Sequence, residues 1–211
     1  STRSCAADFG TIPAAMKRLL LLLFLALPLT AQQFEAGIRH VAALSGETSF
    51  DGGRLEVPLG RGFAATAEVF WTESLATHVA ATFVNPEAIL YVPNDVDLGT
   101  LGMDIVTAEA RWHVRPRARF SPYAGAGAAY AIFGNLEERF GDDIEADLGP
   151  EFTFVAEAGV RYRPMGRVAV ELGVSYLPLQ PSLDVKRTDV TLPAKLDLDP
   201  LIVSIGATWR F

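Results

Sequence analysis

Few residues of this 211-residue chain have the types and spacing that a chemical reaction requires. Gly125 and Gly127, followed by Tyr130, weakly resemble a dinucleotide-binding fingerprint, but the last position should be Gly or Ala and the pattern should open a helix. Here the sequence continues as a strand pattern. We therefore expect these glycines to permit a tight strand crossing or a close interior approach.

The three histidines, His40, His78 and His113, lack the spacing of metal ligands, and hydrogen bonding inside the fold is the simpler interpretation. His40 has Ser45 and Glu47 close to it in sequence, yet no nucleophile motif surrounds them. The sequence therefore predicts no enzyme, no metal site and no cofactor.

An acidic run extends from Glu137 to Asp147. Its paired carboxylates could bind Ca²⁺ or share divalent cations with lipopolysaccharide phosphates, but their spacing departs from that of an EF-hand loop. A solvated loop is the default interpretation. The formal net charge of −7 argues against a nucleic-acid partner, which would favour a basic surface.

The first part of the chain is predicted to be a targeting region. Residues 16–31 combine two basic residues, an apolar run over Leu19–Leu29 and a small residue, Ala31, before a polar stretch, as in a cleaved signal peptide. A helix of that run would rise roughly 16 Å, about half of a hydrocarbon core. Residues 1–15 are interpreted as a non-native or upstream extension.

The remaining body, residues 32–211, alternates between apolar residues and small or polar ones, as strands with two different faces do. Near its end, for example, Leu201 and Val203 share one face while Ile202 and Ser204 share the other. Eight segments show this alternation, close to residues 35–44, 63–71, 75–83, 106–114, 120–133, 152–163, 168–176 and 201–211.

Short and long links between these segments alternate along the chain. The short links are 72–74, 115–118 and 164–167, and the long ones are roughly 45–62, 84–104, 134–150 and 178–198. Short turns at one end, long loops at the other and aromatic residues at the strand ends are typical of outer-membrane barrels. The sequence predicts an all-β fold, an eight-stranded antiparallel up-and-down transmembrane β-barrel.

A soluble β-sandwich or lipocalin-like barrel would alternate in the same way, but its charged residues would cover the outside. The polar face here is too sparse for that, and it suits a narrow lumen in which acids and bases pair. The predicted lumen polar network consists of Glu68, His78, Glu109, Arg111, His113, Glu157, Arg161, Glu171 and Arg210.

Two segments resemble the OmpW family of small outer-membrane barrels. The run from Phe120 to Tyr130 is similar to that family's P-Y-x-G-x-G-x-x-Y strand, and the run from Asp199 to Phe211 is similar to its closing D-P strand that ends in [YW]-R-F. The resemblance covers most of 32–211. It implies the outer membrane of a Gram-negative cell, eight strands, and a mostly apolar cavity that opens outward and passes small hydrophobic molecules.

The 84–104 link contains an unusually large number of apolar residues for a loop in water. Its residues Ile89, Leu90, Tyr91, Val92, Leu98 and Leu101 could line a hydrophobic mouth above the charged lumen, or could extend two strands or fold onto the rim. An eight-stranded interior is just wide enough for side chains to fill, so a water-filled pore is not expected.

The predicted function is a passive channel for small hydrophobic molecules across the outer membrane. The alternative is a structural or adhesive barrel with a sealed, charge-filled lumen and no transport. The expected partners are outer-membrane lipids and lipopolysaccharide, small hydrophobic solutes, and the barrel assembly machinery, which would recognise Phe211.

Overall fold

A computed structural model describes residues 33–44, 47–50, 53–56, 60–85, 87–91, 95–100, 102–134, 144–187, 190–195 and 198–211. Among these residues every regular element is a β-strand, and no helix is long and apolar enough to cross a bilayer. The predicted extension and signal peptide, and most of the acidic run, lie outside the described residues.

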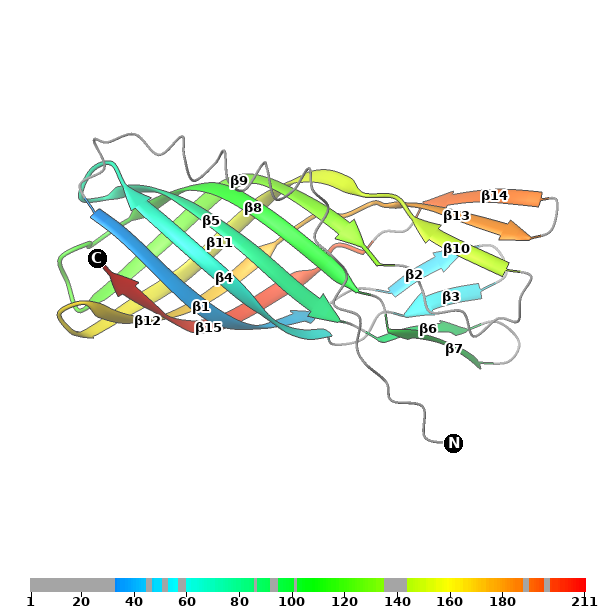
Figure 1. Ribbon diagram of the computed structural model, residues 1–211, viewed down its shortest axis with the longest axis horizontal. Helices are drawn as coiled ribbons and strands as arrows, with labels where there is room; N and C mark the ends of the chain where they lie inside the picture. The colour runs from blue at the N-terminus through cyan, green and yellow to red at the C-terminus, as the bar shows by residue number, and fades with distance from the viewer. Residues whose placement is uncertain are drawn as a thin grey trace, which may run out of the picture. The chain divides into compact units, whose positions relative to one another are not determined.

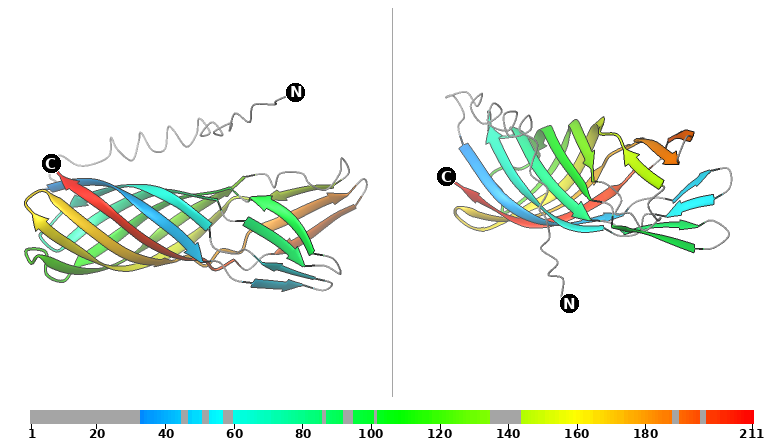
Figure 2. Two further views of the ribbon diagram at one scale, coloured as in Figure 1. Left: turned by 90° about the horizontal axis from the view of Figure 1, so that it is seen from below. Right: turned by 45° about the vertical axis from the view of Figure 1, so that its right-hand side comes forward.

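Eight strands close into an antiparallel barrel, as the sequence predicts (Figures 1 and 2). They are β1 (Gln33–Leu44), β4 (Gly60–Phe70), β5 (Leu75–Asn85), β8 (Met103–His113), β9 (Phe120–Phe133), β11 (Glu151–Met165), β12 (Val168–Tyr176) and β15 (Leu201–Arg210). Each pairs with the next barrel strand along the chain. The barrel closes where β1 pairs with β15, from Glu35 opposite Arg210 to Leu44 opposite Leu201.

Three short turns join barrel strands at one end of the barrel. In the turn between β4 and β5, the Thr72 hydroxyl oxygen accepts hydrogen bonds from the backbone N–H groups of Ser74 and Leu75, at 3.3 and 2.9 Å. The turn between β11 and β12 uses Gly166 at φ +37°, a conformation that glycine adopts without steric cost.

The long connections at the other end contain further strands, although the alternation in the sequence predicts only links there. β2 (Glu47–Phe50), β3 (Gly53–Glu56), β6 (Glu87–Tyr91) and β7 (Asp95–Thr100) form one sheet in that order. β10 (Ile144–Leu148), β13 (Ser182–Arg187) and β14 (Val190–Lys195) form another. These strands have four to six residues, and pairings such as β3 with β6 join two separate connections, so local alternation does not reveal them.

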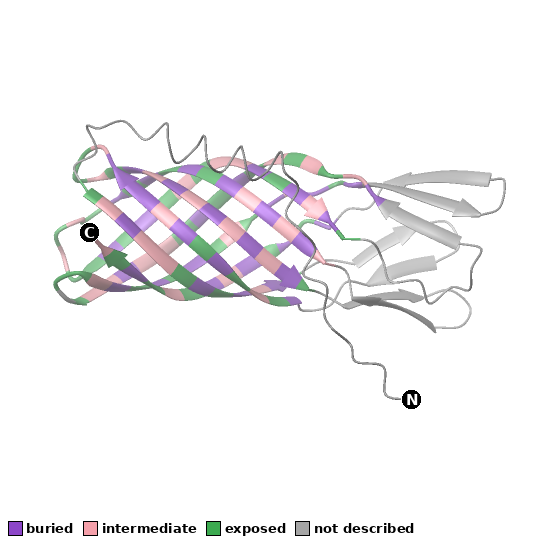
Figure 3. Ribbon diagram, in the orientation of Figure 1, coloured by how far each residue is buried: buried purple, intermediate pink, exposed green. Residues whose placement is uncertain are grey.

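Burial alternates along the barrel strands, so that the wall in Figure 3 shows a checkerboard of buried and exposed residues. The exposed positions are apolar, with Ile38 at 69% and Phe152 at 73% exposure, whereas the buried positions include Arg39 and Glu157. This is the reverse of a soluble protein. An apolar exterior around a polar lumen is what a hydrocarbon environment requires of a barrel.

A charge on this exterior should therefore destabilise the barrel according to its depth. Ile205, in the middle of β15, lies opposite His40 and Leu172 and is 53% exposed. We expect Ile205→Arg to cost about 2–4 kcal/mol of unfolding free energy and Leu201→Arg, at the strand end, about 0–1 kcal/mol. Denaturant unfolding in lipid vesicles measures both. Equal losses would contradict a lipid-facing exterior.

Candidate functional site

The barrel lumen is divided into two layers along its length. The buried side chains of β8 show this in order from the long-connection end to the short-turn end: Met103, Ile105, Thr107, Glu109, Arg111 and His113. The other strands repeat the gradient, as where Val155 precedes Glu157 and Arg161 on β11. The lumen is therefore apolar at the long-connection end and charged at the short-turn end.

One half of the charged layer is centred on Glu157. Its carboxylate accepts hydrogen bonds from Arg39 at 2.9 Å, from the Tyr123 hydroxyl at 3.0 Å, and from Arg111. Arg39 also reaches Glu171, on the neighbouring strand β12. Each of these side chains is almost fully buried, so the layer excludes water as it pairs its charges.

The other half is centred on Arg161, which contacts Glu68 and Glu171 and lies 3.4 Å from Glu35 Oε2. Glu68 also pairs with His113 Nε2 at 2.9 Å. At the edge of the layer nearest the short turns, Glu35 Oε1 accepts hydrogen bonds from Arg163 at 2.8 Å and Arg210 at 2.7 Å. Acids and bases from strands that are distant in sequence thus alternate across the lumen.

The structure brings the nine residues of the predicted lumen network into this layer or its edge, where Arg210 is partly exposed. Sequence reasoning missed Glu35, Arg39, Tyr123 and Arg163, which make many of the contacts. Glu35, Arg39 and Val41 share a parity on β1, so a closer look at the alternation there could have found two of them.

Glycines make room for the charged side chains. A Cβ at Gly125 would lie 2.8 Å from Arg111 Cγ, and one at Gly173 would lie 2.7 Å from Glu157 Oε1 and 2.8 Å from the Tyr123 hydroxyl. Real Cβ atoms essentially never approach other atoms so closely. The close approach expected at Gly125 is present, and it serves the packing of the lumen rather than a phosphate.

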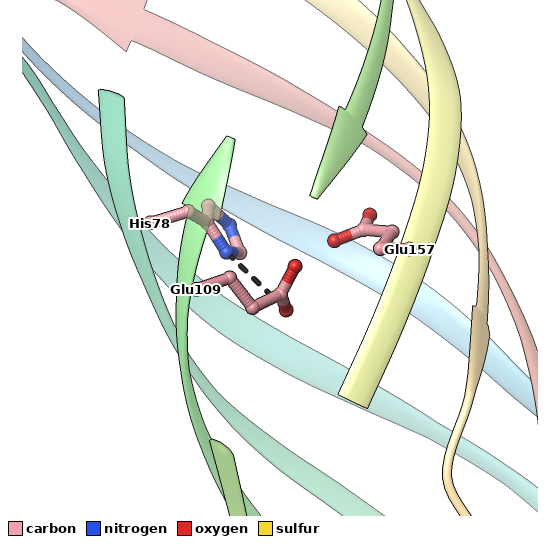
Figure 4. Close-up of side chains that lie close together, drawn as sticks. All are labelled: His78, Glu109 and Glu157. Atoms are coloured by element: carbon pink, nitrogen blue, oxygen red, sulfur yellow. Dashed lines mark ion pairs between the residues drawn. The ribbon is translucent and has the colours of Figure 1, made fainter. Parts of the chain in front are cut away.

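His78, Glu109 and Glu157 face one another from three strands, as Figure 4 shows, and offer ligand atoms within 4.8 Å of one another. His78 Nδ1 lies 3.9 Å from Glu109, and neither ring nitrogen of His78 has a hydrogen-bond partner in the described part of the chain. Glu157, however, is already held by Arg39 and Arg111. A metal ion there would compete with both guanidinium groups.

A small cavity of about 30 Å³, bounded in part by His78, Glu109 and Glu157, lies between the charged and apolar layers. It is large enough for a water molecule, which could satisfy the ring of His78. A second acidic group, Glu35, Glu68 and Glu171, also has the spacing of metal ligands, but arginines contact all three carboxylates.

One histidine prediction is wrong. His40 was expected to hydrogen bond inside the fold, but it is exposed on the outer face of β1. The reason is parity: Arg39 and Val41, its neighbours in sequence, occupy the lumen, so His40 must point the other way.

The apolar layer is built by residues near the long connections, among them Val41, Ile105, Phe133, Val155 and Ile202. Val84 and Met103, at the two ends of the 84–104 link, belong to it. Of the predicted mouth residues, Ile89, Leu90 and Tyr91 lie in β6 and Leu98 in β7, while Val92 and Leu101 lie outside the described residues. Their lining role stays a prediction.

An apolar outer wall, a polar lumen, short turns and long connections together define an outer-membrane β-barrel. The chain belongs to the OmpW family, whose model matches residues 38–211. It therefore lies in the bacterial outer membrane, with its short turns on the periplasmic side.

Solved structures show the same fold. OprG from Pseudomonas aeruginosa is 15% identical, with a TM-score of 0.77, and the match covers 86% of this chain and 97% of OprG. The membrane protein AlkL, determined in lipid bilayers, is 16% identical with a TM-score of 0.60, covering 85% and 90% of the two chains. The Escherichia coli outer membrane protein W is 19% identical with a TM-score of 0.52, covering 87% and 100%. No curated protein sequence matches.

The ion pairs of the charged layer should contribute to the unfolding free energy of the barrel. Arg161→Gln leaves Glu68 and Glu171 buried with fewer partners, so we expect a loss of about 3–5 kcal/mol in unfolding free energy. Adding Glu68→Gln should recover part of that loss. Denaturant unfolding in vesicles measures all three proteins.

The matched control is Arg117→Gln. Arg117 pairs with Glu73 at the rim, where the two side chains are 83% and 57% exposed, so its removal should cost less than about 1 kcal/mol. A loss from Arg161→Gln no larger than that of the control would show that the charged layer does not stabilise the barrel.

Proposed function

We propose that this protein is a passive conduit through which small hydrophobic molecules enter the outer membrane. The observation that carries the proposal is the apolar outer half of the lumen, with Ile105, Val155 and Ile202 among its residues. Apolar side chains at the outer end of the lumen would not favour the binding of a water-soluble solute. They would favour an apolar solute, because its transfer from water into an apolar space lowers the free energy. The family resemblance points in the same direction.

The charged layer limits the route. To cross it, a solute would have to separate Glu157 and Glu171 from their arginines, and an unpaired buried ion costs several kcal/mol. The cavity between the layers, at about 30 Å³, is also far smaller than such a solute. The charged layer therefore blocks a direct route to the periplasm, and the proposed conduit delivers solutes from the outer lumen into the outer membrane.

A second candidate function is a structural or adhesive barrel with a sealed lumen. The same charged layer favours it, and so does the tight packing of the apolar layer, in which Val84 and Ala131 have no exposed surface. Under this function the apolar layer is the part of the barrel core nearest the long connections and has no role in transport.

Several partners follow from these two functions as proposals. Membrane lipid contacts the outer wall, lipopolysaccharide surrounds its outer end, and the barrel assembly machinery recognises Phe211, which is 72% exposed. We propose no catalytic role, because the buried carboxylates of Glu68, Glu157 and Glu171 are held by arginines.

Uptake of a hydrophobic fluorophore by cells with and without the protein, scored beside a hydrophilic sugar, tests the conduit. We expect faster entry of the fluorophore alone. Ala131→Phe, which fills the apolar lumen from β9, should return entry to the rate of cells that lack the protein. Leu90→Asp and Leu101→Asp should do the same if the predicted mouth is part of the route.

Ala126→Phe is the matched control, since it makes the same change on the exposed face of the same strand and should leave uptake unchanged. Heat-dependent gel mobility confirms that each variant is folded. If the protein does not change entry of the fluorophore, the conduit is wrong and the sealed barrel is the better account.

A further inference from the structure

A cavity of about 510 Å³ opens at the periplasmic end of the barrel, below the charged layer. Five arginines line it, and they are Arg117, Arg119, Arg161, Arg163 and Arg210. Among the described residues of the lining, Glu73 is the single acidic one. In a chain whose formal net charge is −7, this concentration of guanidinium groups is unusual.

The nearby carboxylates do not use all of the donors. Arg163 and Arg210 both donate to the same oxygen of Glu35, and Arg117 contacts Glu73 at the rim. Arg163 Nε is buried and has no hydrogen-bond partner among the described residues. Arg161, Arg163 and Arg210 share carboxylates that lie behind the lining, so the five arginines still exceed the acids that pair with them, and Arg163 retains an unused N–H donor.

Ser121 is a second and independent observation. Its side chain lines the cavity and is 3% exposed, yet its hydroxyl has no partner in the part of the chain that the structure describes. A buried hydroxyl without a partner costs stability unless something in the adjacent space bonds to it. Ser121 Oγ and Arg163 Nε are the unsatisfied atoms of the described lining residues, and both can donate. The unsatisfied acceptor behind the lining, Glu35 Oε2, already lies 3.4 Å from Arg161.

We propose that this periplasmic vestibule binds a phosphate group. Guanidinium forks match phosphate oxygens in geometry and charge, and the Ser121 hydroxyl can donate to the same group. The cavity falls within the size range of small-molecule sites and exceeds what a bare phosphate fills, so the group belongs to a larger molecule. A phosphorylated periplasmic solute and a phospholipid of the inner leaflet offer this same chemistry. The site does not depend on the proposed conduit.

Calorimetry with glycerol 3-phosphate tests the proposal on the full chain in a phosphate-free maltoside detergent. We expect saturable binding that Ser121→Ala weakens several-fold and Arg163→Gln weakens about tenfold or more. Arg163→Gln also removes one partner of Glu35, so heat-dependent gel mobility must show that it folds. Ser121→Ala removes only an unpaired hydroxyl, so a loss of binding in this variant cannot result from a broken ion pair.

Arg167→Gln is the matched control, because Arg167 is exposed, lies in a turn at the same end and does not line the cavity. It should leave binding nearly unchanged. An equal loss in Arg167→Gln and Arg163→Gln would mean diffuse attraction by surface charge, and absence of saturable binding would mean no site. Either result overturns the proposal, unless a tightly held lipid already fills the cavity.

A second experiment tests whether a lipid already occupies the cavity. Protein reconstituted in vesicles of phosphatidylglycerol and phosphatidylethanolamine is extracted into maltoside, washed, and assayed for bound phospholipid by phosphorus NMR. Lipid retained by the wild type and by Arg167→Gln, but lost from Ser121→Ala and Arg163→Gln, identifies a headgroup as the source. Binding of glycerol 3-phosphate without retained lipid identifies a soluble phosphate ester. No binding in calorimetry together with no retained lipid rejects the site.

Discussion

Every backbone N–H and C=O group inside a bilayer must find its partner within the protein, and this constraint shapes the whole structure. Eight antiparallel strands meet it by closing β1 onto β15, which leaves no open edge. Closure with so few strands makes the interior narrow, so inward side chains must fill it. Ionisable residues in that space have to pair, and the network around Glu157 and Arg161 follows from this requirement.

Pairing divides the lumen into chemically distinct parts. The apolar layer faces the outer connections, the charged layer closes the middle, and an arginine-lined cavity opens to the periplasm. Small residues such as Gly125 and Gly173 give the charged side chains their space. A barrel of this kind has two separate ends rather than one continuous pore, and our two proposals assign a different ligand to each end: an apolar solute to the outer end and a phosphate group to the periplasmic end.

The barrel and much of its lumen could be predicted from the sequence, because alternation reports directly which face a residue occupies. Glu109 and Arg111 are two residues apart on a strand and therefore had to share a face. Their partners could not be predicted, since Glu157 meets Arg39 only through barrel closure. The strands of the long connections could not be predicted either, because they have only four to six residues and some of their pairings, such as β3 with β6, join two separate connections. Glu35 and Arg39 were missed where small residues weaken the alternation of β1.

The central claim is that the outer lumen admits apolar solutes and the charged layer stops them. Methyl NMR of the barrel in lipid nanodiscs, titrated with a short alkane, tests it most directly. The account predicts saturable shifts at the methyl groups of Ile105, Val155 and Ile202, with no change at Ala169, which lies at the periplasmic end of β12. Shifts confined to the exposed methyl groups of the outer wall, such as those of Ile38 and Leu172, would contradict it.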